Sequence, residues 1–495
     1  MLKKRHAIIM VVVALTVTAG VPVDALNVRT HELVNIAAAG SAAFDTYLRE
    51  ALGFSNGRET LLQNGPLDLT AELWLAEGGT HEDDGGLLTA RFYNHFHNPL
   101  KPWSEAGLHA TGHSSSSVQW MQDPNQGWGW KDAREFYRKA LTSSDLGTRE
   151  AATADLFRAL GQVMHLVVDA SVPEHTRSDP HPLGTITNLL GLRAGNYEYW
   201  VSEQHAGPAE GDFIARYLSN PIGFDSSILQ IPAPPGESVA TVPIARLIDT
   251  DRYQEHGPLP PDPNVTLGGA IGLAEFSNAN FFSEDTRHGT FPFPRRAGLT
   301  PSPRVAPKGS RVRAYLAKPA GQGLPTAVAL AECVTERSVG RWTVSKSAPY
   351  PCVDEAVWQE TATHMLPRAV GYARGVLDYF FRGRLRAEFW TYSVSPPGTA
   401  LVAIVNESGE SMSGNFQFYV DGTSQFRQRA SATYINVNSD PWSYYPGATF
   451  SLAPGEAAVA VMNAPPAGGT HHMLVFEGRL GLEENAVASD TVVLP

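Results

Sequence analysis

Apolar side chains recur at helical spacing along much of the first 200 residues. In the segment 149–168, Leu156, Leu160 and Val163 fall on one stripe of a 3.6-residue repeat, which is typical of a helix packed on a core. The same pattern predicts further helices after the N-cap candidate Thr30 and over 130–141, 197–203, 269–282 and 354–382. Pro367 falls inside the last of these segments and predicts a kink or a break there.

The pattern changes after about residue 386, where short strand-like runs are separated by turn residues such as Asp421-Gly422. The runs are 401–405, 416–420, 458–461 and 473–476. An insertion rich in Pro and Gly occupies about 206–350, in which 206–265 indicate loops and 286–325 again look irregular. We therefore expect a mainly α-helical domain over 26–385 that carries this insertion, followed by a β-sandwich over 386–495.

The amino terminus has the pattern of a secretory signal peptide. Basic residues at 3–5 precede an apolar run at 7–21, and residues 23–25 offer small side chains where a signal peptidase needs them. The run is too short for a membrane anchor, and no later stretch is apolar enough to span a bilayer. We expect residues 1–25 to be removed and the protein to be secreted or periplasmic, with no integral membrane segment.

The sequence has two cysteines, Cys333 and Cys352. In an oxidising compartment they are expected to form one disulfide that closes a short loop. Two thiols are too few for a cysteine-based zinc site.

The segment 162–175 carries a chemical signal. His165 and Asp169 are four residues apart and so share one face of the predicted helix. Pro173 predicts the end of that helix, and the turn that follows lets His175 approach the same point. Burial of His165 and Asp169 would cost several kcal/mol unless they are paired or bound to a metal. Imidazole and carboxylate are suitable zinc ligands, so the segment predicts a metal site.

A second cluster lies upstream, where an acidic loop at 77–86 contains Asp83. An aromatic run at 91–99 follows directly and holds His95. Acidic loops are usually only solvated, but histidines in such a run favour a ligand role. His31, just after the expected cleavage site, is a third candidate, although alone it would be an ordinary histidine in a first helical turn.

The order of these elements resembles that of the zinc-dependent phospholipases C of bacteria and the zinc-dependent single-strand nucleases of fungi and plants. The string His165-x-x-x-Asp169-x-x-x-Pro-x-His175 is similar to their signature, and His95-Phe-His-Asn-Pro is similar to their His-Phe-aromatic-Asp-Pro segment. The resemblance implies that the helical domain is catalytic and holds two to three zinc ions in a cleft. It implies a hydrolase that cleaves phosphoric esters with a metal-bound hydroxide.

The resemblance also implies the role of each ligand. Asp169 bridges two metal ions, and Asp83 also orients the nucleophile, with Glu82 as the alternative to Asp83. Leu26 becomes the first mature residue and supplies its amine and carbonyl, a position where the family usually has Trp. The implied ligand groups are Asp83, His95 and His165 at one site, Leu26 and His31 at a second, and His175 and Glu198 at a third, with Asp169 shared.

One departure from the family affects the third site, which the family closes with His-x-x-x-Glu. Glu198 is present, but the position four residues earlier is Ala194. Either His181 substitutes for the absent histidine, or the third site is weak or empty.

The expected substrate is a phosphodiester. The formal net charge of −12 opposes strong binding of a polyanion, and the aromatics Trp103, Trp120, Trp128, Trp130 and Trp200 suit a lipid or a choline-like cation. Phospholipid is therefore favoured, with peripheral contact to a membrane, over single-stranded nucleic acid. A third alternative is a non-catalytic, zinc-stabilised binding protein.

Overall fold

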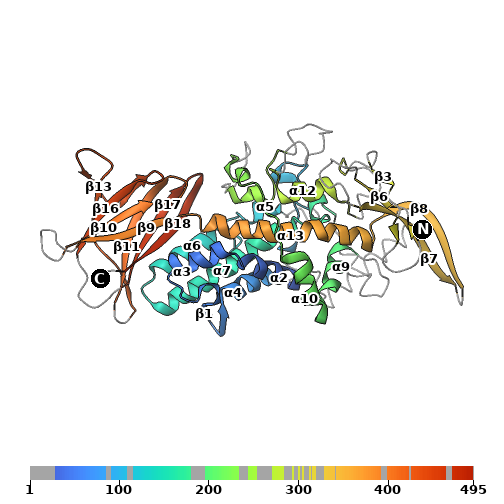
Figure 1. Ribbon diagram of the computed structural model, residues 1–495, viewed down its shortest axis with the longest axis horizontal. Helices are drawn as coiled ribbons and strands as arrows, with labels where there is room; N and C mark the ends of the chain where they lie inside the picture. Colours follow the sequence, from blue (N-terminus) through green and yellow to red (C-terminus); the bar gives the residue numbers. More distant parts are fainter. Residues whose placement is uncertain are drawn as a thin grey trace.

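The computed structural model has a helical body with a β-sandwich at one end (Figure 1). The described residues are 28–84, 91–108, 115–179, 196–232, 243–252, 270–283, 292–294, 299–301, 304–305, 312–313, 315–318, 328–339, 342–391, 399–422, 425–463 and 471–493. The expected fold class, a mainly α-helical domain followed by a C-terminal β-sandwich, is confirmed.

The helical body contains α-helices and shorter 3-10 or π-helical turns. The α-helices are α2 (Val28–Ala39), α3 (Ala42–Glu50), α4 (Ala71–His81), α5 (Ser117–Trp120), α6 (Trp130–Thr142), α7 (Leu146–Asp169), α9 (Tyr197–Gln204), α10 (Glu210–Phe213), α12 (Leu273–Asn280) and α13 (Glu355–Phe380). The shorter turns are η1 (Gly57–Glu59), η3 (Phe92–Asn94), η4 (Trp103–Glu105), η5 (His175–Arg177), η6 (Gly207–Ala209), η7 (Ile214–Leu218), η8 (Ser226–Gln230) and η9 (Pro243–Leu247).

Strands occur mainly in the second half of the chain. Those before the sandwich are β1 (Leu61–Asn64), β2 (Leu67–Thr70), β3 (Thr300–Pro301), β4 (Arg304–Val305), β5 (Val312–Arg313), β6 (Tyr315–Ala317), β7 (Val328–Val339) and β8 (Trp342–Cys352). Those of the sandwich are β9 (Leu385–Thr391), β10 (Thr399–Asn406), β11 (Met412–Asp421), β12 (Arg427–Arg429), β13 (Ala432–Asn436), β14 (Ser443–Tyr444), β15 (Thr449–Leu452), β16 (Ala457–Asn463), β17 (His471–Leu480) and β18 (Glu483–Val493).

Helix α7 lies at the centre of the helical body. It begins after Asp145, whose carboxylate accepts a hydrogen bond from the Thr148 N–H at 2.7 Å. Helices α2, α4, α6 and α13 all pack against it, so its second half is buried almost without interruption. The polar side chains of that half, Gln162, His165 and Asp169, are therefore shielded from water.

Helices α4 and α7 cross at a point where both have glycine. A Cβ on Gly161 would lie 2.1 Å from the carbonyl oxygen of Leu75, and a Cβ on Gly78 would lie 2.1 Å from the carbonyl oxygen of Arg158. Asn35 of α2 closes the same junction, because its Nδ2 donates to the carbonyl oxygens of Leu75 at 2.9 Å and Gly161 at 3.2 Å. Helices α4 and α7 are thereby held at backbone contact beside the polar half of α7, and the Asn35 side chain ties α2 to both.

The sandwich consists of two antiparallel sheets, with strand orders β14-β13-β16-β10-β9 and β12-β11-β17-β18. Strand β15 also pairs with β11, along the start of that strand. The inner faces bury Phe416 and Phe418 of β11, which are two residues apart, and Phe476 of β17. This alternation follows the period of two on which the strands were predicted. The first strand of the sandwich, β9, begins at Leu385, next to the expected domain boundary at 386.

The structure differs from the expected regular structure at two places. The stretch at 286–325, expected to be irregular, contains the short strands β3 to β6, and β3 and β6 join the antiparallel sheet β3-β6-β7-β8. The long β7–β8 hairpin of this sheet, for which no element was predicted, extends away from the helical body (Figure 1). Helix α13 continues through Pro367, so of the two expected outcomes a break does not occur. Leu366 and Ala369 on either side of the proline are fully buried, and this packing offsets the lost backbone hydrogen bond.

Some expectations fall outside the described residues. The expected signal peptide and Leu26 lie within 1–27, and Ala194 and His181 lie within 180–195. The backbones of Cys333 and Cys352 lie on the paired strands β7 and β8, but their side chains are beyond what the structure describes, so the disulfide stays a prediction. Among the helices that the structure describes, none has the length and apolar character to cross a membrane.

A buried ionic cluster joins the helical body to the sandwich. Glu483 of β18 accepts hydrogen bonds from Nε and Nη2 of Arg134, both at 2.9 Å, and from Trp130 Nε1 at 2.7 Å. Arg382, just after α13, donates from Nη1 to the same carboxylate at 2.6 Å. Burial raises the pKa of Glu483, but Arg134 and Arg382 outweigh burial and hold the pKa below its usual value. These charge-assisted bonds fix the sandwich against α6 and α13.

The glycine crossing predicts opposite outcomes for one substitution at two places on α7. Gly161→Ala should lower the free energy of unfolding by about 1–3 kcal/mol or more, because its Cβ overlaps the backbone of α4. Gly147→Ala should leave stability unchanged or raise it by up to about 1 kcal/mol, because the new Cβ has only Asp145 Oδ2 nearby, at 3.5 Å. Urea unfolding of both variants measures this free energy. Equal changes in Gly161→Ala and Gly147→Ala would contradict the close approach of α4 and α7 at Gly161.

The ionic cluster predicts that Glu483→Gln lowers the free energy of unfolding by about 3–5 kcal/mol, because the buried guanidinium of Arg134 loses its charge partner and the partly buried Arg382 keeps only Glu410. Glu484→Gln is the matched control, since Glu484 is 68% exposed and lies 3.6 Å from an exposed Arg479. Because the pKa of Glu483 is lower in the folded state, its stabilisation is present above the unfolded value near 4.5 and is lost as pH falls through the folded value. Denaturant titrations should therefore show the difference between wild type and Glu483→Gln shrinking in acid, and a difference that grew in acid would contradict the cluster.

Candidate metal centre

The end of helix α7 brings His175 back toward Asp169. The helix ends at Asp169, as Pro173 predicts. Two successive turns follow, in which the Val172 N–H donates to the Asp169 carbonyl at 2.9 Å and the His175 N–H donates to the Val172 carbonyl at 3.1 Å. His175 Nδ1 consequently lies 3.6 Å from Asp169 Oδ1.

His165 is oriented by the backbone of α4. Its Nδ1 lies 2.7 Å from the carbonyl oxygen of Gly79, and a carbonyl can only accept, so this nitrogen carries a hydrogen. In the neutral ring the other nitrogen, Nε2, then offers its lone pair to the side where Asp169 Oδ2 lies at 3.2 Å. A ring nitrogen that donates to a carbonyl while the other faces a site is the usual arrangement of a metal-ligating histidine.

Asp169 lies at the centre of a group of four imidazoles. Its Oδ1 is 3.4 Å from His31 Nε2 and 3.6 Å from His175 Nδ1. Its Oδ2 is 3.1 Å from His95 Nδ1 and 3.2 Å from His165 Nε2. All five side chains are buried. A carboxylate whose two oxygens face separate pairs of nitrogens has the geometry of a ligand between two cations.

Asp83 and His31 complete the cluster on the side of α4 and α2. Asp83 follows the end of α4, and its Oδ1 lies 3.5 Å from His95 Nδ1 and 3.8 Å from His165 Nε2. The ring of His31 stacks on that of His165, with centroids 3.5 Å apart and an angle of 8° between the planes. Two groups have ligand atoms within 4.8 Å of one another, namely His31, Asp83 and His165, and His95, His165 and Asp169. The groups share His165, which differs from the separate sets that the family resemblance implies.

Several buried polar atoms of this cluster make no hydrogen bond. Among the described residues, this holds for both nitrogens of His31 and His95, for Nε2 of His165 and for both oxygens of Asp169. Buried polar groups in folded proteins nearly always have partners. Two ligands about 2.0–2.1 Å from a tetrahedral zinc ion lie roughly 3.4 Å apart. The separations of 3.1–3.4 Å from Asp169 to His31, His95 and His165 are close to that value, so these residues fit zinc.

The carboxylates dominate the electrostatics of the cluster. Burial opposes a charge on His165, but Asp169 and Asp83 outweigh burial and raise its pKa to about 10. Burial, together with the positive charge of His165, lowers the pKa of His31 to about 4. Burial also raises the pKa of Asp169, yet His165 and His175 hold it well below the usual range. The cluster thus attracts a positive charge, and a metal ion must compete with protons for it.

Glu82, the alternative to Asp83, is held by other groups. Its carboxylate accepts hydrogen bonds from Arg91 and, at 2.8 Å, from Trp120 Nε1. Arg91 also donates to Gln162 of α7 at 2.6 Å, which ties the acidic loop to the central helix. Asp83 is therefore better placed as a ligand, and Glu82 and Arg91 position it. The sequence offered no sign of this role for Arg91.

His97 and Asp249 support the loop that carries His175. His97 Nε2 lies 2.7 Å from Asp249 Oδ2, and Trp103 Nε1 donates to the same oxygen at 2.9 Å. The His97 N–H donates to the His175 carbonyl at 3.0 Å. The sequence did not single out Asp249, because it lies 152 residues from His97 in a segment of loops.

The third group contains His175 and Glu198. His175 Nε2 lies 3.1 Å from Glu198 Oε1, and both side chains are buried. Glu198 is placed by the first turn of α9, where the side chain of Asn196 accepts a hydrogen bond from the Tyr199 N–H at 2.8 Å. Leu26, the remaining ligand implied by the resemblance, falls before the first described residue.

No family model matches the chain, and no curated protein matches it. Solved structures similar to it include the alpha-toxin of Clostridium perfringens from avian strain SWCP, which is 10% identical, with 94% of this chain and 96% of that chain covered and a TM-score of 0.28. The alpha toxin of Clostridium absonum is also 10% identical, with 94% and 98% covered and the same TM-score of 0.28. This likeness is weak and carries nothing about activity.

The cluster predicts that Asp169→Asn removes most of the bound metal. Wild type purified with zinc should hold two to three ions per chain, and the variant should hold fewer because a neutral amide replaces the shared carboxylate. Asp155→Asn on the same helix is the matched control, since its bond from Asn64 Nδ2, at 2.7 Å, can be kept by the amide oxygen. Elemental analysis measures metal per chain. Less than one ion in wild type, or equal contents in wild type and Asp169→Asn, would remove the basis of the site.

Proposed function

We propose that this protein is a secreted, zinc-dependent phosphoric ester hydrolase that cleaves a phosphodiester lipid in the manner of a phospholipase C. The observation that carries the proposal is the buried Asp169, whose two oxygens each face two imidazole nitrogens at 3.1–3.6 Å. Zinc ions held there supply Lewis acidity and a nucleophile from water at neutral pH. The similarity of the segment 165–175 to the signature of zinc phospholipases and nucleases supports the same chemistry.

The roles proposed for the residues follow their burial and spacing. Asp169 would be shared by two cations, and the histidines at 31, 95, 165 and 175 would hold them. The side chain of Asp83 is 5% exposed, whereas those of His95 and Asp169 are fully buried. Asp83 therefore lies nearest to solvent in this group, where it can orient the attacking water by accepting its proton. Glu198 would hold a third cation with His175.

The charges beside the cluster favour a lipid over nucleic acid. Single-strand binding needs a basic groove lined with aromatic side chains. Arg91, which lies beside the cluster, is engaged by Glu82, Gln126 and Gln162. The formal net charge of the chain is −12, which repels a polyanion along its length. A single phosphodiester with an apolar tail avoids that repulsion.

The aromatic side chains expected to meet the substrate have other partners. Trp103 and Trp130 are buried and donate to Asp249 and Glu483. Trp120 and Trp128 are half-buried and lie beneath the guanidiniums of Arg91 and Arg158, at 5.3 and 4.5 Å from the ring centroids. The preference for lipid therefore comes from the charge balance and not from these rings.

We further propose peripheral contact with a membrane through the sandwich. Trp442 directly precedes β14, Tyr444 is its last residue, and the two are 63% and 72% exposed. Trp and Tyr favour the interface between lipid and water, because their rings are apolar and their N–H or O–H groups remain hydrated.

The proposal predicts that wild type cleaves phosphatidylcholine with a higher kcat/KM than single-stranded DNA at equal zinc. A chelator should abolish the cleavage, and readdition of zinc should restore it. Asp169→Asn should lower kcat/KM at least about a hundredfold. Mutation of a residue that only hydrogen-bonds to a metal ligand already lowers activity by up to about that factor. The control Asp155→Asn should retain wild-type activity. Faster cleavage of DNA would assign the chain to the nuclease alternative, and cleavage of neither would favour a zinc-stabilised binding protein.

A further inference from the structure

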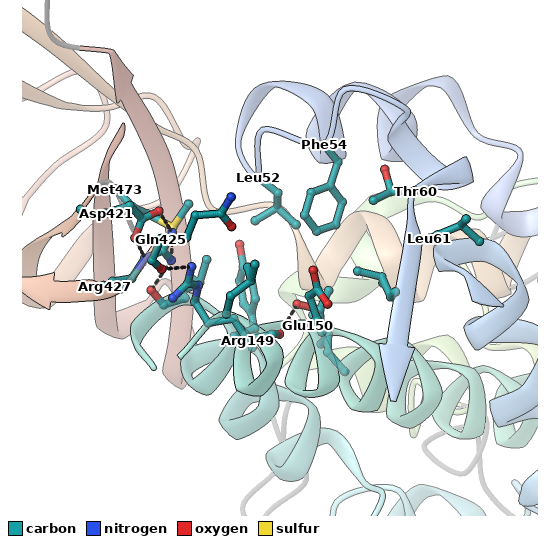
Figure 2. A pocket seen from close by; sticks show the side chains of 18 residues that line it. Leu52, Phe54, Thr60, Leu61, Arg149, Glu150, Asp421, Gln425, Arg427 and Met473 are labelled. Atoms are coloured by element: carbon teal, nitrogen blue, oxygen red, sulfur yellow. Dashed lines mark hydrogen bonds and ion pairs between the residues drawn. The ribbon is translucent and has the colours of Figure 1, made fainter. Parts of the chain in front are cut away.

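A second site lies between the helical body and the sandwich, at the opposite end of α7 from the metal centre (Figure 2). It is a pocket of about 620 Å³. Arg149 lines it in the first turns of α7, roughly 24 Å along the helix from His165 at 1.5 Å per residue. Both the volume and the position at a domain junction are typical of small-molecule sites.

The pocket has an apolar part and a charged part. Leu52 and Phe54, from the loop after α3, form one wall (Figure 2), and Leu146 of α7 also lines the pocket. Leu61 and Leu146, which also line the pocket, are 60% and 38% exposed. The charged residues Arg149, Glu150, Asp421 and Arg427 line the part shared by α7 and the sandwich. Such a pocket fits an amphipathic ligand.

Arg149 determines the charge of that ligand. It is 6% exposed, and its guanidinium donates to the carbonyl oxygens of Ser143, Ser144 and Gln425 at 2.9–3.1 Å. No carboxylate of the described residues lies within 4.0 Å of it. The carboxylate of Asp421 is held instead by two hydrogen bonds from Arg427, at 2.6 and 2.7 Å.

Burial of Arg149 and the nearby positive charge of Arg427 lower its pKa, and the charges of Asp421, Asp145 and Glu150 only partly offset them. The direct partners of the guanidinium are three neutral carbonyl oxygens, so no ion pair within the described residues neutralises its charge. A buried charge is costly unless an opposite charge pairs with it. An anionic head group at this position would provide that pair, with the two charges in a region of low dielectric.

We propose that this pocket binds a free single-chain anionic amphiphile, a fatty acid of about ten carbons or more, with its carboxylate at Arg149 and its alkyl chain along Leu52, Phe54 and Leu146. Glu150 lines the same pocket and opposes an anion, so it limits the affinity. The site is independent of the metal centre and of the proposed hydrolysis.

Calorimetric titration of the zinc-loaded protein with decanoate, decanol and decyltrimethylammonium tests the charge of the ligand. Decanoate should bind one per chain, at least about tenfold more tightly than the neutral and cationic analogues. Arg149→Gln should weaken decanoate binding at least about tenfold, and Arg149→Lys should weaken it less. Glu150→Gln should strengthen it about two- to fivefold, because the opposing charge is removed.

Two controls separate this pocket from other sites. Asp169→Asn should bind decanoate as wild type does, which excludes binding of the carboxylate to zinc. Arg138→Gln, next to the junction on α6 and 42% exposed, should also leave binding unchanged. If Arg149→Gln does not fold, Glu150→Gln and Leu146→Trp decide, since the exposed Leu146 can be enlarged to fill the entrance. No decanoate binding up to the millimolar range, or binding that ignores Arg149, Glu150 and Leu146, would overturn the proposal.

Discussion

The burial of Asp169 among imidazoles is the constraint on which the rest of the helical body depends. A carboxylate that loses water costs several kcal/mol unless cations or hydrogen bonds compensate it. Here the compensation comes from nitrogens on four separate segments, at 3.1–3.6 Å. Those segments meet only if α4 and α7 approach through Gly78 and Gly161, since a Cβ at either place would overlap backbone atoms. The same approach brings the Gly79 carbonyl to His165 and fixes which nitrogen faces Asp169. Packing and ligand geometry are therefore one requirement.

A second buried carboxylate, Glu483, holds the sandwich, and its burial is compensated in a different way. Glu483 is surrounded by permanent cations, Arg134 and Arg382, and its charge is satisfied within the protein itself. Asp169 faces histidines, whose charge depends on protons and metal ions. The first arrangement is suited to a fixed joint, because nothing from solution is needed to complete it. The second is suited to binding, because it is completed from outside.

Local and non-local features differ in what the sequence reveals. The helix that carries His165 and its end before Pro173 were predictable because both depend on neighbours in the chain. The presence of the sandwich was predictable, because apolar and polar side chains alternate along a half-buried strand whichever strand it pairs with. The pair of His97 with Asp249 was not, since a contact across 152 residues leaves no periodic trace. The β7–β8 hairpin, with paired strands of 12 and 11 residues, was not predicted, because the segment between the irregular stretch at 286–325 and the helix at 354 was treated only as part of the insertion. Trp130 was expected to suit the substrate but donates a hydrogen bond to Glu483. The sequence could not show this contact either, because Glu483 lies 353 residues away.

The two ends of α7 differ in their electrostatics. A helix carries about half a positive charge at its amino end and half a negative charge at its carboxyl end. At the amino end the N-cap Asp145 offsets the positive end, because its carboxylate accepts a hydrogen bond from the Thr148 N–H at 2.7 Å. At the carboxyl end the last turn contains no basic residue, and the final residue is Asp169. Asp169 therefore adds to the negative field of that end instead of cancelling it. This end of the helix attracts cations, and a cation bound there would stabilise the fold that holds it.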